Sequence, residues 1–305
     1  MRRIAALAAG CLVVIGCATT GQGDTQRMPG IIAHRGASAY APENTLAAFR
    51  LAHEQQADWF ELDCTLTRDG QVLVIHDNTV DRTTPGKGEV RTLSLEELKR
   101  LDAGGWMDPK FAGERLPTLG ESLDLAKGRI GVYIEIKDSA DDDELKARIL
   151  DLVKDHETLT PERWTKVRAL IENSGSANLE LTRKVIAQVR DRHMQKKVVI
   201  QSFSPIVCAV ALAEAPEIRT EILGGDDKKK PEIWEGFLRW GYLLDADGFN
   251  PNKDAVTPGR LAAFHAAGKT VSVWTVDDEA GMRRLAEWGV DNIITNKPDL
   301  CRKTS

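Results

Sequence analysis

Residues 59–77 read WFELDCTLTRDGQVLVIHD, and this stretch carries the clearest structural signals of the chain. Its first part, 59–63, is rich in residues that favour β-strands. The Asp-Gly pair at 69–70 is typical of a hairpin turn, so we expect the run 72–75 to fold back on the extension of the first strand. One strand of a larger sheet is therefore followed at once by an extra antiparallel strand.

Similar β-rich runs recur along the chain and alternate with helix-like segments. The expected strands are 31–33, 59–63, 132–136, 198–202, 219–223, 245–249, 270–276 and 292–295. The expected helices are 44–56, 119–128, 141–154, 178–193, 204–214, 256–268 and 278–288, with a less regular connection at 231–242. This alternation predicts an α/β fold of the (β/α)8, or TIM, barrel class. A doubly wound open sheet competes, but no G-x-G-x-x-G turn supports it.

One connection differs from a crossover helix. Residues 82–118 are rich in Gly, Thr and Pro, with a single helix expected near 94–102. We interpret them as a small insertion after the second barrel strand. The segment 138–197 holds more helix than one crossover requires, so the sequence does not define the structure of the adjacent pocket rim. The barrel domain as a whole is expected to span 30–305.

The first residues predict an export signal. Met1-Arg2-Arg3 is followed by apolar or small residues up to Gly16, too short a run to span a bilayer. Residues 14–17 read VIGC, which resembles the lipobox of bacterial lipoproteins, so 1–16 would be removed and Cys17 lipidated. The alternative is an ordinary cleaved secretory peptide with an incidental cysteine.

This N-terminus implies a location at the cell envelope. Residue 18 is Ala rather than Asp, which by resemblance to sorting patterns favours the periplasmic face of the outer membrane in a Gram-negative host. Residues 17–29 are expected to form a flexible tether, and the membrane would be contacted through the lipid only. The formal net charge of −5 does not favour binding to the negatively charged backbone of a nucleic acid. The later cysteines show no metal-binding spacing; they are Cys64, Cys208 and Cys301.

Charged side chains gather at the predicted strand ends. Glu61 and Asp63 share one face of the second strand, and Glu135 and Lys137 share one face of the third, because alternate residues of a strand point the same way. The carboxyl ends of barrel strands converge at one mouth. Three carboxylates meeting there would repel one another, and a bound hard cation removes that conflict. Oxygen-only ligands favour Ca²⁺ or Mg²⁺.

The basic residues at the same mouth suit a phosphate ester. His34 and Arg35 follow the first strand, and His76 follows the hairpin strand. Arg can hold two phosphate oxygens, and Lys137 supplies a point charge. Two histidines can serve as a general base and a general acid near neutral pH.

The segment PENT at 42–45 has two interpretations. It is expected to begin a helix, with Asn44 as its N-terminal cap. Asn44 could also support the site from behind. The other histidines, among them His53 and His265, are expected at the surface or in packing.

An ordered series of motifs extends this set. The chain contains HRGA at 34–37, ELD at 61–63, VIHD at 74–77, IEIK at 134–137, QSF at 201–203 and VWTV at 273–276, together with APENT, LDAG, FAGE and PTL. In this order they resemble the glycerophosphodiester phosphodiesterase family over residues 30–300. The resemblance implies a TIM barrel of the phospholipase C-like phosphodiesterase type.

The resemblance also implies roles. Glu61, Asp63 and Glu135 would bind one divalent cation, and His34 and His76 would be the acid–base pair. Arg35 and Lys137 would hold the phosphate. Trp274, with Phe203 as a weaker candidate, would wall the substrate pocket.

The implied reaction is metal-dependent hydrolysis of a small glycerophosphodiester to sn-glycerol 3-phosphate and an alcohol, through a cyclic phosphate. Two alternatives remain open at this stage. One is a lysophospholipase D-like or sphingomyelinase D-like phosphodiesterase on the same barrel. The other is a catalytically silent lipoprotein that binds phosphodiesters. The sequence indicates no oligomeric state.

Overall fold

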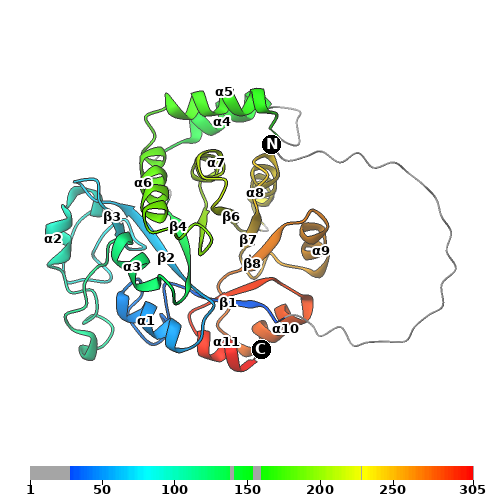
Figure 1. The fold of residues 1–305 in the computed structure, drawn as a ribbon. Helices are drawn as coiled ribbons and strands as arrows, with labels where there is room; N and C mark the ends of the chain where they lie inside the picture. Colours follow the sequence, from blue (N-terminus) through cyan, green and yellow to red (C-terminus); the bar gives the residue numbers. More distant parts are fainter. Residues whose placement is uncertain (1–27, 138–140, 154–158, 228, 305) are drawn as a thin grey trace, which may run out of the picture.

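Eight parallel strands close into a ring surrounded by helices in the computed structural model, which describes residues 28–137, 141–153, 159–227 and 229–304 (Figure 1). Each strand pairs with its neighbour in chain order, and the first also pairs with the last, which closes the barrel. The ring consists of β1 (Gly30–Ala33), β2 (Trp59–Leu66), β4 (Gly131–Ile136), β5 (Val198–Ser202), β6 (Arg219–Gly224), β7 (Gly248–Pro251), β8 (Thr270–Val273) and β9 (Asn292–Thr295). The predicted TIM barrel is confirmed. The proposed signal peptide and Cys17 lie outside the described residues.

The hairpin predicted at 69–70 is also present. Strand β3 (Val72–Val74) pairs antiparallel with the end of β2, with Cys64 opposite Val74, and lies outside the ring. The backbone N–H of Thr67 donates to the carbonyl of Gln71 across the turn. The strand therefore runs back from the carboxyl end of β2 and brings the residues that follow it beside Asp63, where the Ile75 N–H donates to the Asp63 carbonyl at 3.0 Å.

Residues 82–118 contain three short helices and contribute to a hydrophobic core separate from that of the barrel. The helices are η1 (Val90–Thr92), α2 (Leu95–Lys99) and η2 (Pro109–Phe111). Ser94 and Glu97 form a capping box at the start of α2. The small core lies over β3 and consists of Leu73, Ile75, Val80, Val90, Leu98, Ala103 and Leu116.

The outer helices cover the ring and bury its outward-facing side chains. They are α1 (Leu46–Glu54), α3 (Leu119–Ala126), α6 (Ala177–Asp191), α7 (Pro205–Glu214), α8 (Pro231–Leu243), α9 (Pro258–Ala266), α10 (Glu279–Trp288) and α11 (Pro298–Thr304). The main core lies between these helices and the strands. None of the helices within the described ranges has the length and apolar character of a membrane span.

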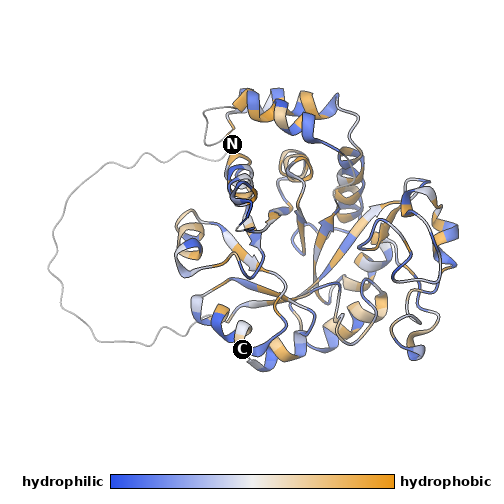
Figure 2. Cartoon of the chain, turned by 180° about the vertical axis from the view of Figure 1, so that it is seen from behind, coloured by the Kyte–Doolittle hydropathy of each residue, from blue (hydrophilic) through white to orange (hydrophobic). Residues whose placement is uncertain are grey.

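Two additional helices account for the long segment after β4. Helices α4 (Asp143–Val153) and α5 (Pro161–Glu172) form a layer outside the ring, with α5 over α7 (Figures 1 and 2). Every residue from Pro205 to Ala211 in α7 is buried. A helix with apolar residues on all its faces is normally buried on all of them, so α7 needs a covering element on its outer side as well. The α5 layer therefore explains why α7 has no polar face.

The barrel interior is filled from its amino-terminal end. Ile32, Tyr133, Val199 and Ile294 form a buried layer with Trp59 and Trp274 packed against it. A Cβ at Gly131 would lie 2.1 Å from the Trp59 ring, so this position has no room for a side chain. The layer closes the floor and leaves the carboxyl end open.

Strand boundaries differ from the prediction at two places: the strand expected at 270–276 ends at Val273, and the strand before it starts late. The strand expected at 245–249 begins only at Gly248 and runs to Pro251. Helix α8 extends to Leu243, and Asp245 has a φ of 55°, a left-handed conformation that a strand cannot contain.

Candidate active site

Three buried carboxylates meet at the carboxyl ends of two neighbouring strands. Asp63 on β2 is directly opposite Glu135 on β4, and Glu61 lies two residues before Asp63 on the same face. Each offers one oxygen, and these oxygens lie within 4.8 Å of one another. Their exposures are 1% for Glu61, 1% for Asp63 and 9% for Glu135, so water does little to screen their charges.

The electrostatics of this cluster fit a bound cation. Burial, with Asp63 and Glu135 nearby, raises the pKa of Glu61 well above its ordinary value. Burial also raises the pKa of Glu135, to about 7, whereas the neighbouring Arg35 and Lys137 outweigh burial at Asp63 and lower its pKa. Glu61 Oε1 is buried and has no hydrogen-bond partner among the described residues. An orphaned oxygen in an all-carboxylate donor set suits a hard divalent cation.

Arg35 is held in place by its backbone as well as by its side chain. Its φ is 55°, and in this conformation its N–H donates to Glu61 Oε2 at 2.9 Å. Its side chain donates from Nη1 to Glu43 Oε1 at 3.0 Å, and Nε lies 3.4 Å from Asp63 Oδ2. At the next residue, Gly36, a Cβ would lie 2.6 Å from the Ala48 carbonyl carbon. The turn after β1 therefore requires glycine and directs the guanidinium to the site.

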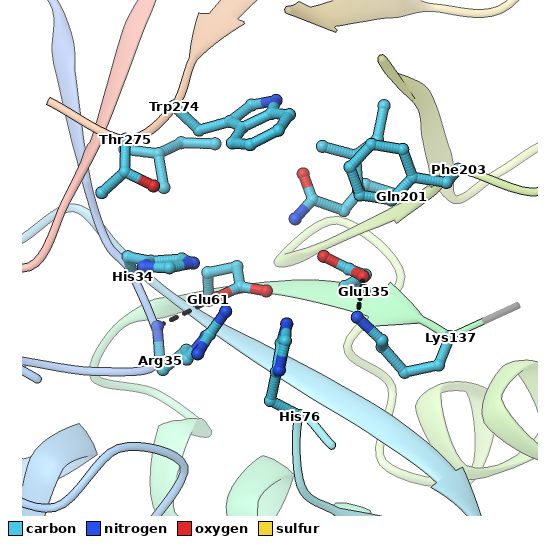
Figure 3. Close-up of a pocket in the computed structure, with 12 residues that line it drawn as sticks. His34, Arg35, Glu61, His76, Glu135, Lys137, Gln201, Phe203, Trp274 and Thr275 are labelled. Atoms are coloured by element: carbon cyan, nitrogen blue, oxygen red, sulfur yellow. Dashed lines mark hydrogen bonds and ion pairs between the residues drawn. The ribbon is translucent and has the colours of Figure 1, made fainter. Parts of the chain in front are cut away.

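Lys137 completes the basic pair from the other side of the cluster. Its Nζ lies 2.7 Å from Glu135 Oε1 and 3.6 Å from Asp63 Oδ1. Arg35 and Lys137 both line the same pocket, on either side of the carboxylates (Figure 3). A phosphate group between them would contact positive charge from two sides.

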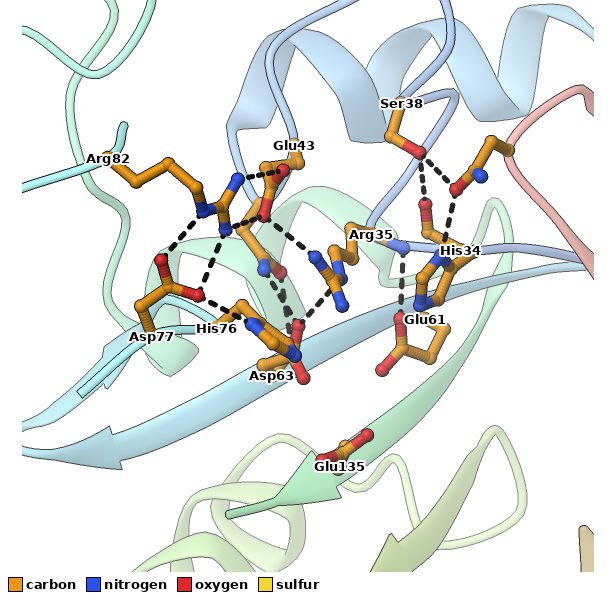
Figure 4. Close-up of polar contacts among 12 residues, drawn as sticks. His34, Arg35, Ser38, Glu43, Glu61, Asp63, His76, Asp77, Arg82 and Glu135 are labelled. Atoms are coloured by element: carbon orange, nitrogen blue, oxygen red, sulfur yellow. Dashed lines mark hydrogen bonds and ion pairs between the residues drawn. The ribbon is translucent and has the colours of Figure 1, made fainter. Parts of the chain in front are cut away.

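Both histidines present one ring nitrogen to the pocket and have the other engaged. His34 Nδ1 lies 2.8 Å from Asn296 Oδ1, and His76 Nδ1 lies 2.7 Å from Asp77 Oδ1 (Figure 4). Because Asn296 donates its own amide to Asp277, its oxygen is the group that faces His34. Both partners are then acceptors, so each Nδ1 carries a proton, and each Nε2 faces the pocket, where it can accept or donate one. Burial lowers the pKa of His34, which favours its neutral form.

The pocket is small and has one aromatic wall. Its volume is about 200 Å³, below the roughly 300–1,000 Å³ of sites for drug-sized ligands. Trp274 lines it and donates its indole N–H to the carbonyl of Asn250 at 2.7 Å. Phe203 packs edge-to-face on Trp274 and is 47% exposed, so it forms the rim (Figure 3).

Comparison with known proteins identifies the family. A model of the glycerophosphoryl diester phosphodiesterase family matches residues 34–300. The chain belongs to this family. It is 35% identical over 269 residues to the glycerophosphodiester phosphodiesterase of Caldanaerobacter subterraneus, covering 88% of this chain and 94% of the relative. The protein is thus a glycerophosphodiester phosphodiesterase.

Solved structures agree with this assignment. A glycerophosphodiester phosphodiesterase from Agrobacterium tumefaciens is 33% identical, with a TM-score of 0.65 over 90% of this chain and 100% of that one. A phosphodiesterase from Oleispira antarctica, solved in complex with the product sn-glycerol-3-phosphate, is 26% identical, with a TM-score of 0.71 over 91% and 96% of the two chains.

Asn44 of the phosphodiesterase does not have the capping role expected for it. Helix α1 is capped by Thr45, whose side chain accepts from the N–H of Ala48. Asn44, with a φ of 57°, instead donates Nδ2 to Asp63 Oδ2 at 2.9 Å and accepts from the Asp63 N–H at 3.2 Å. The cap prediction is wrong. The alternative, support of the site from behind, agrees with this geometry.

Sequence reasoning missed most of the residues that orient the phosphodiesterase site. Gln201 is the clearest example, because the QSF motif at 201–203 contains it but does not indicate what its side chain contacts. Asn250 Nδ2 donates to Gln201 Oε1 at 2.8 Å, which leaves the Gln201 amide nitrogen toward the pocket (Figure 3). The others are Glu43, Asp77, Arg82, Asp277 and Asn296; Asp77 is the chain neighbour of His76, and the other four make contacts that no local pattern reveals.

Proposed function

We propose that the enzyme hydrolyses water-soluble glycerophosphodiesters to sn-glycerol 3-phosphate and an alcohol such as choline or ethanolamine. The observation that carries this proposal is the pair of histidines with Nε2 toward one small pocket, beside a carboxylate cluster and two basic side chains. The product bound to the Oleispira antarctica relative is the same compound, which supports the assignment of the glycerol side.

The residues suit acid–base catalysis of phosphoryl transfer. His34, whose neutral form is favoured by burial, accepts the proton of the hydroxyl next to the phosphodiester, and that oxygen attacks phosphorus. His76, protonated on both ring nitrogens, then donates its Nε2 proton to the departing alkoxide, while its Nδ1–H stays on Asp77. The roles reverse when water opens the resulting cyclic phosphate. Arg35 and Lys137 hold the phosphoryl oxygens, and Trp274 packs against the carbon atoms of the substrate.

The three carboxylates Glu61, Asp63 and Glu135 would hold one divalent cation, Ca²⁺ or Mg²⁺. When bound, the cation supplies positive charge to the phosphoryl oxygens as charge develops on them.

The internal route makes a substrate prediction. A diester that lacks the free hydroxyl beside the phosphate cannot form the cyclic phosphate, so we expect its turnover to fall by at least about 100-fold, the scale of a lost intramolecular nucleophile. The measurement compares glycerophosphocholine with its 2-deoxy analogue at saturating metal. Equal turnover of the two would mean that water attacks phosphorus directly.

The pocket favours small head-group diesters over lysolipids. With a volume of about 200 Å³, it matches a glycerol phosphate, and an acyl chain would have to lie outside it. We expect kcat/KM for glycerophosphocholine to exceed that for lysophosphatidylcholine. The reverse preference would support the lysophospholipase D-like alternative, and preferred cleavage of sphingomyelin would support the sphingomyelinase D-like one.

We also propose that the enzyme is lipid-anchored through Cys17 at the cell envelope, on the strength of the VIGC tetrapeptide. The membrane would be contacted through this lipid alone. Cys17→Ser should abolish labelling with radioactive palmitate and leave the protein unprocessed or released. Turnover of glycerophosphocholine by the purified barrel should be unchanged. If the variant is correctly processed and stays membrane-bound at wild-type levels, the anchor proposal is wrong.

A further inference from the structure

The guanidinium of Arg82 lies between two carboxylates at the edge of the site. Its Nε and Nη2 bind Asp77 at 2.7 and 3.1 Å, and its Nη1 and Nη2 bind Glu43, both at 2.8 Å (Figure 4). Both contacts are bidentate, which is the strongest and most directional way for an arginine to bind a carboxylate. One side chain thus fixes two acids that would otherwise repel each other.

Each of these carboxylates in turn holds a side chain of the proposed catalytic machinery. Asp77 Oδ1 lies 2.7 Å from His76 Nδ1, and Glu43 Oε1 accepts from Arg35 Nη1 at 3.0 Å. His76 follows β3, whereas Arg35 follows β1, so the two come from separate parts of the barrel mouth. Arg82 joins them through one hydrogen-bonded series, drawn in Figure 4.

The backbone around Arg82 is fixed by the small core over β3. Val80 is fully buried there, its N–H donates to the carbonyl of Gly88, and its own carbonyl accepts from Thr84 Oγ1 at 2.8 Å. Arg82 therefore projects from an ordered turn rather than from a loose loop. The arginine also lowers the pKa of Asp77 to about 2, which keeps that carboxylate ionised behind His76.

We propose that Arg82 is a positioning residue that sets the orientation of both His76 and Arg35, and that the segment beginning at 82 thereby takes part in catalysis. The proposal rests on the proposed function for the roles of His76 and Arg35. A lysine could not replace Arg82, because an ammonium group cannot form two planar bidentate contacts at once.

The test uses Arg82→Ala and Arg82→Lys in the metal-loaded full chain. We expect kcat/KM for glycerophosphocholine to fall about 10–100-fold in both, since small misplacements of catalytic groups cost rates of that order. The loss should divide into a lower kcat, through His76, and a higher KM, through Arg35. The Arg82 side chain is 44% exposed, so added guanidinium ion can enter its place, and it should restore part of the activity of Arg82→Ala. Ammonium ion at the same concentration should not.

A matched control is Arg91→Ala in the same segment. Arg91 is 75% exposed and pairs with Glu89, away from the site, so its loss should leave kcat and KM within about twofold of wild type. In a double-mutant cycle, Arg82→Ala and Asp77→Asn should be less than additive, because they break the same series of contacts.

Three results would overturn the proposal: activity of Arg82→Ala within about twofold of wild type, a loss restored equally by ammonium, or a loss that guanidinium does not restore. Failure of the proposed function is recognised separately, as absence of turnover in the wild type. In that case isothermal titration with sn-glycerol 3-phosphate still reports on Arg35, and Arg82→Ala should weaken this binding about tenfold. Equal affinity in the two proteins would count against the positioning role.

Discussion

Replacing either His34 or His76 by alanine is expected to lower kcat by about 10²–10⁴-fold, the contribution of one general acid or base. Each imidazole has its Nδ1 engaged by an acceptor and its Nε2 toward the pocket, so alanine removes the ring nitrogen that would carry the proton. Metal affinity should be nearly unchanged, because the proposed ligands are carboxylates. Single-turnover rates and calorimetric metal titration of each variant measure the two effects.

The double variant and a surface histidine serve as controls. The kcat of the double variant His34→Ala/His76→Ala should be only slightly lower than that of the less active single variant, because both groups serve one proton-transfer cycle. His53→Ala, on the exposed side of α1, should keep wild-type kcat. If His76→Ala abolished metal binding while Glu135→Gln left it intact, the roles would be reversed, and a mixed nitrogen–oxygen site for a softer metal would fit better.

Removing one carboxylate of the cluster should have opposite effects on the metal-free and metal-loaded protein. When no cation is bound, burial and the nearby Asp63 and Glu135 raise the pKa of Glu61, so the folded chain must either protonate this carboxyl or keep its charge buried, and either destabilises the fold. We therefore expect metal-free Glu61→Gln to unfold at a higher temperature than the metal-free wild type. The wild type should gain more thermal stability on addition of Mg²⁺ or Ca²⁺, since a ligand that binds only the folded state stabilises it.

The activity of the same variant follows from its weaker metal binding. At low metal concentration Glu61→Gln should be nearly inactive, and excess Mg²⁺ or Ca²⁺ should recover part of kcat. Glu180→Gln, at an exposed position on α6, is the matched control and should behave as wild type in both assays. A wild-type melting temperature that does not respond to either metal would contradict the assignment of the cluster as a cation site.

The sequence predicts those parts of the molecule that depend on local pattern. The alternation of strands and helices gave the barrel, and the Asp-Gly pair at 69–70 gave the extra strand β3. The period of two along a strand placed Glu61 and Asp63 together, and barrel topology brought Glu135 beside them. These inferences hold because side-chain direction in a strand is fixed by the backbone.

Apart from the contact between the neighbours His76 and Asp77, the supporting contacts could not be predicted in the same way, because they join residues that are not adjacent in the chain. Asn44 was expected to cap a helix and instead binds Asp63, since its left-handed backbone turns the side chain inward. Arg82 lies 39 positions from Glu43, and Asn296 lies 262 from His34. The late start of β7 depends on the length of α8, which hydrophobic pattern alone does not fix.

The most direct test of the account is release of sn-glycerol 3-phosphate by the purified wild-type protein, followed with a coupled glycerol-3-phosphate dehydrogenase. The protein is incubated with glycerophosphocholine or glycerophosphoethanolamine, with Mg²⁺, with Ca²⁺ or with a chelator. We expect product in the presence of at least one of the two metals and little with the chelator. No product from either diester under any metal condition would contradict the account and favour a catalytically silent phosphodiester-binding protein.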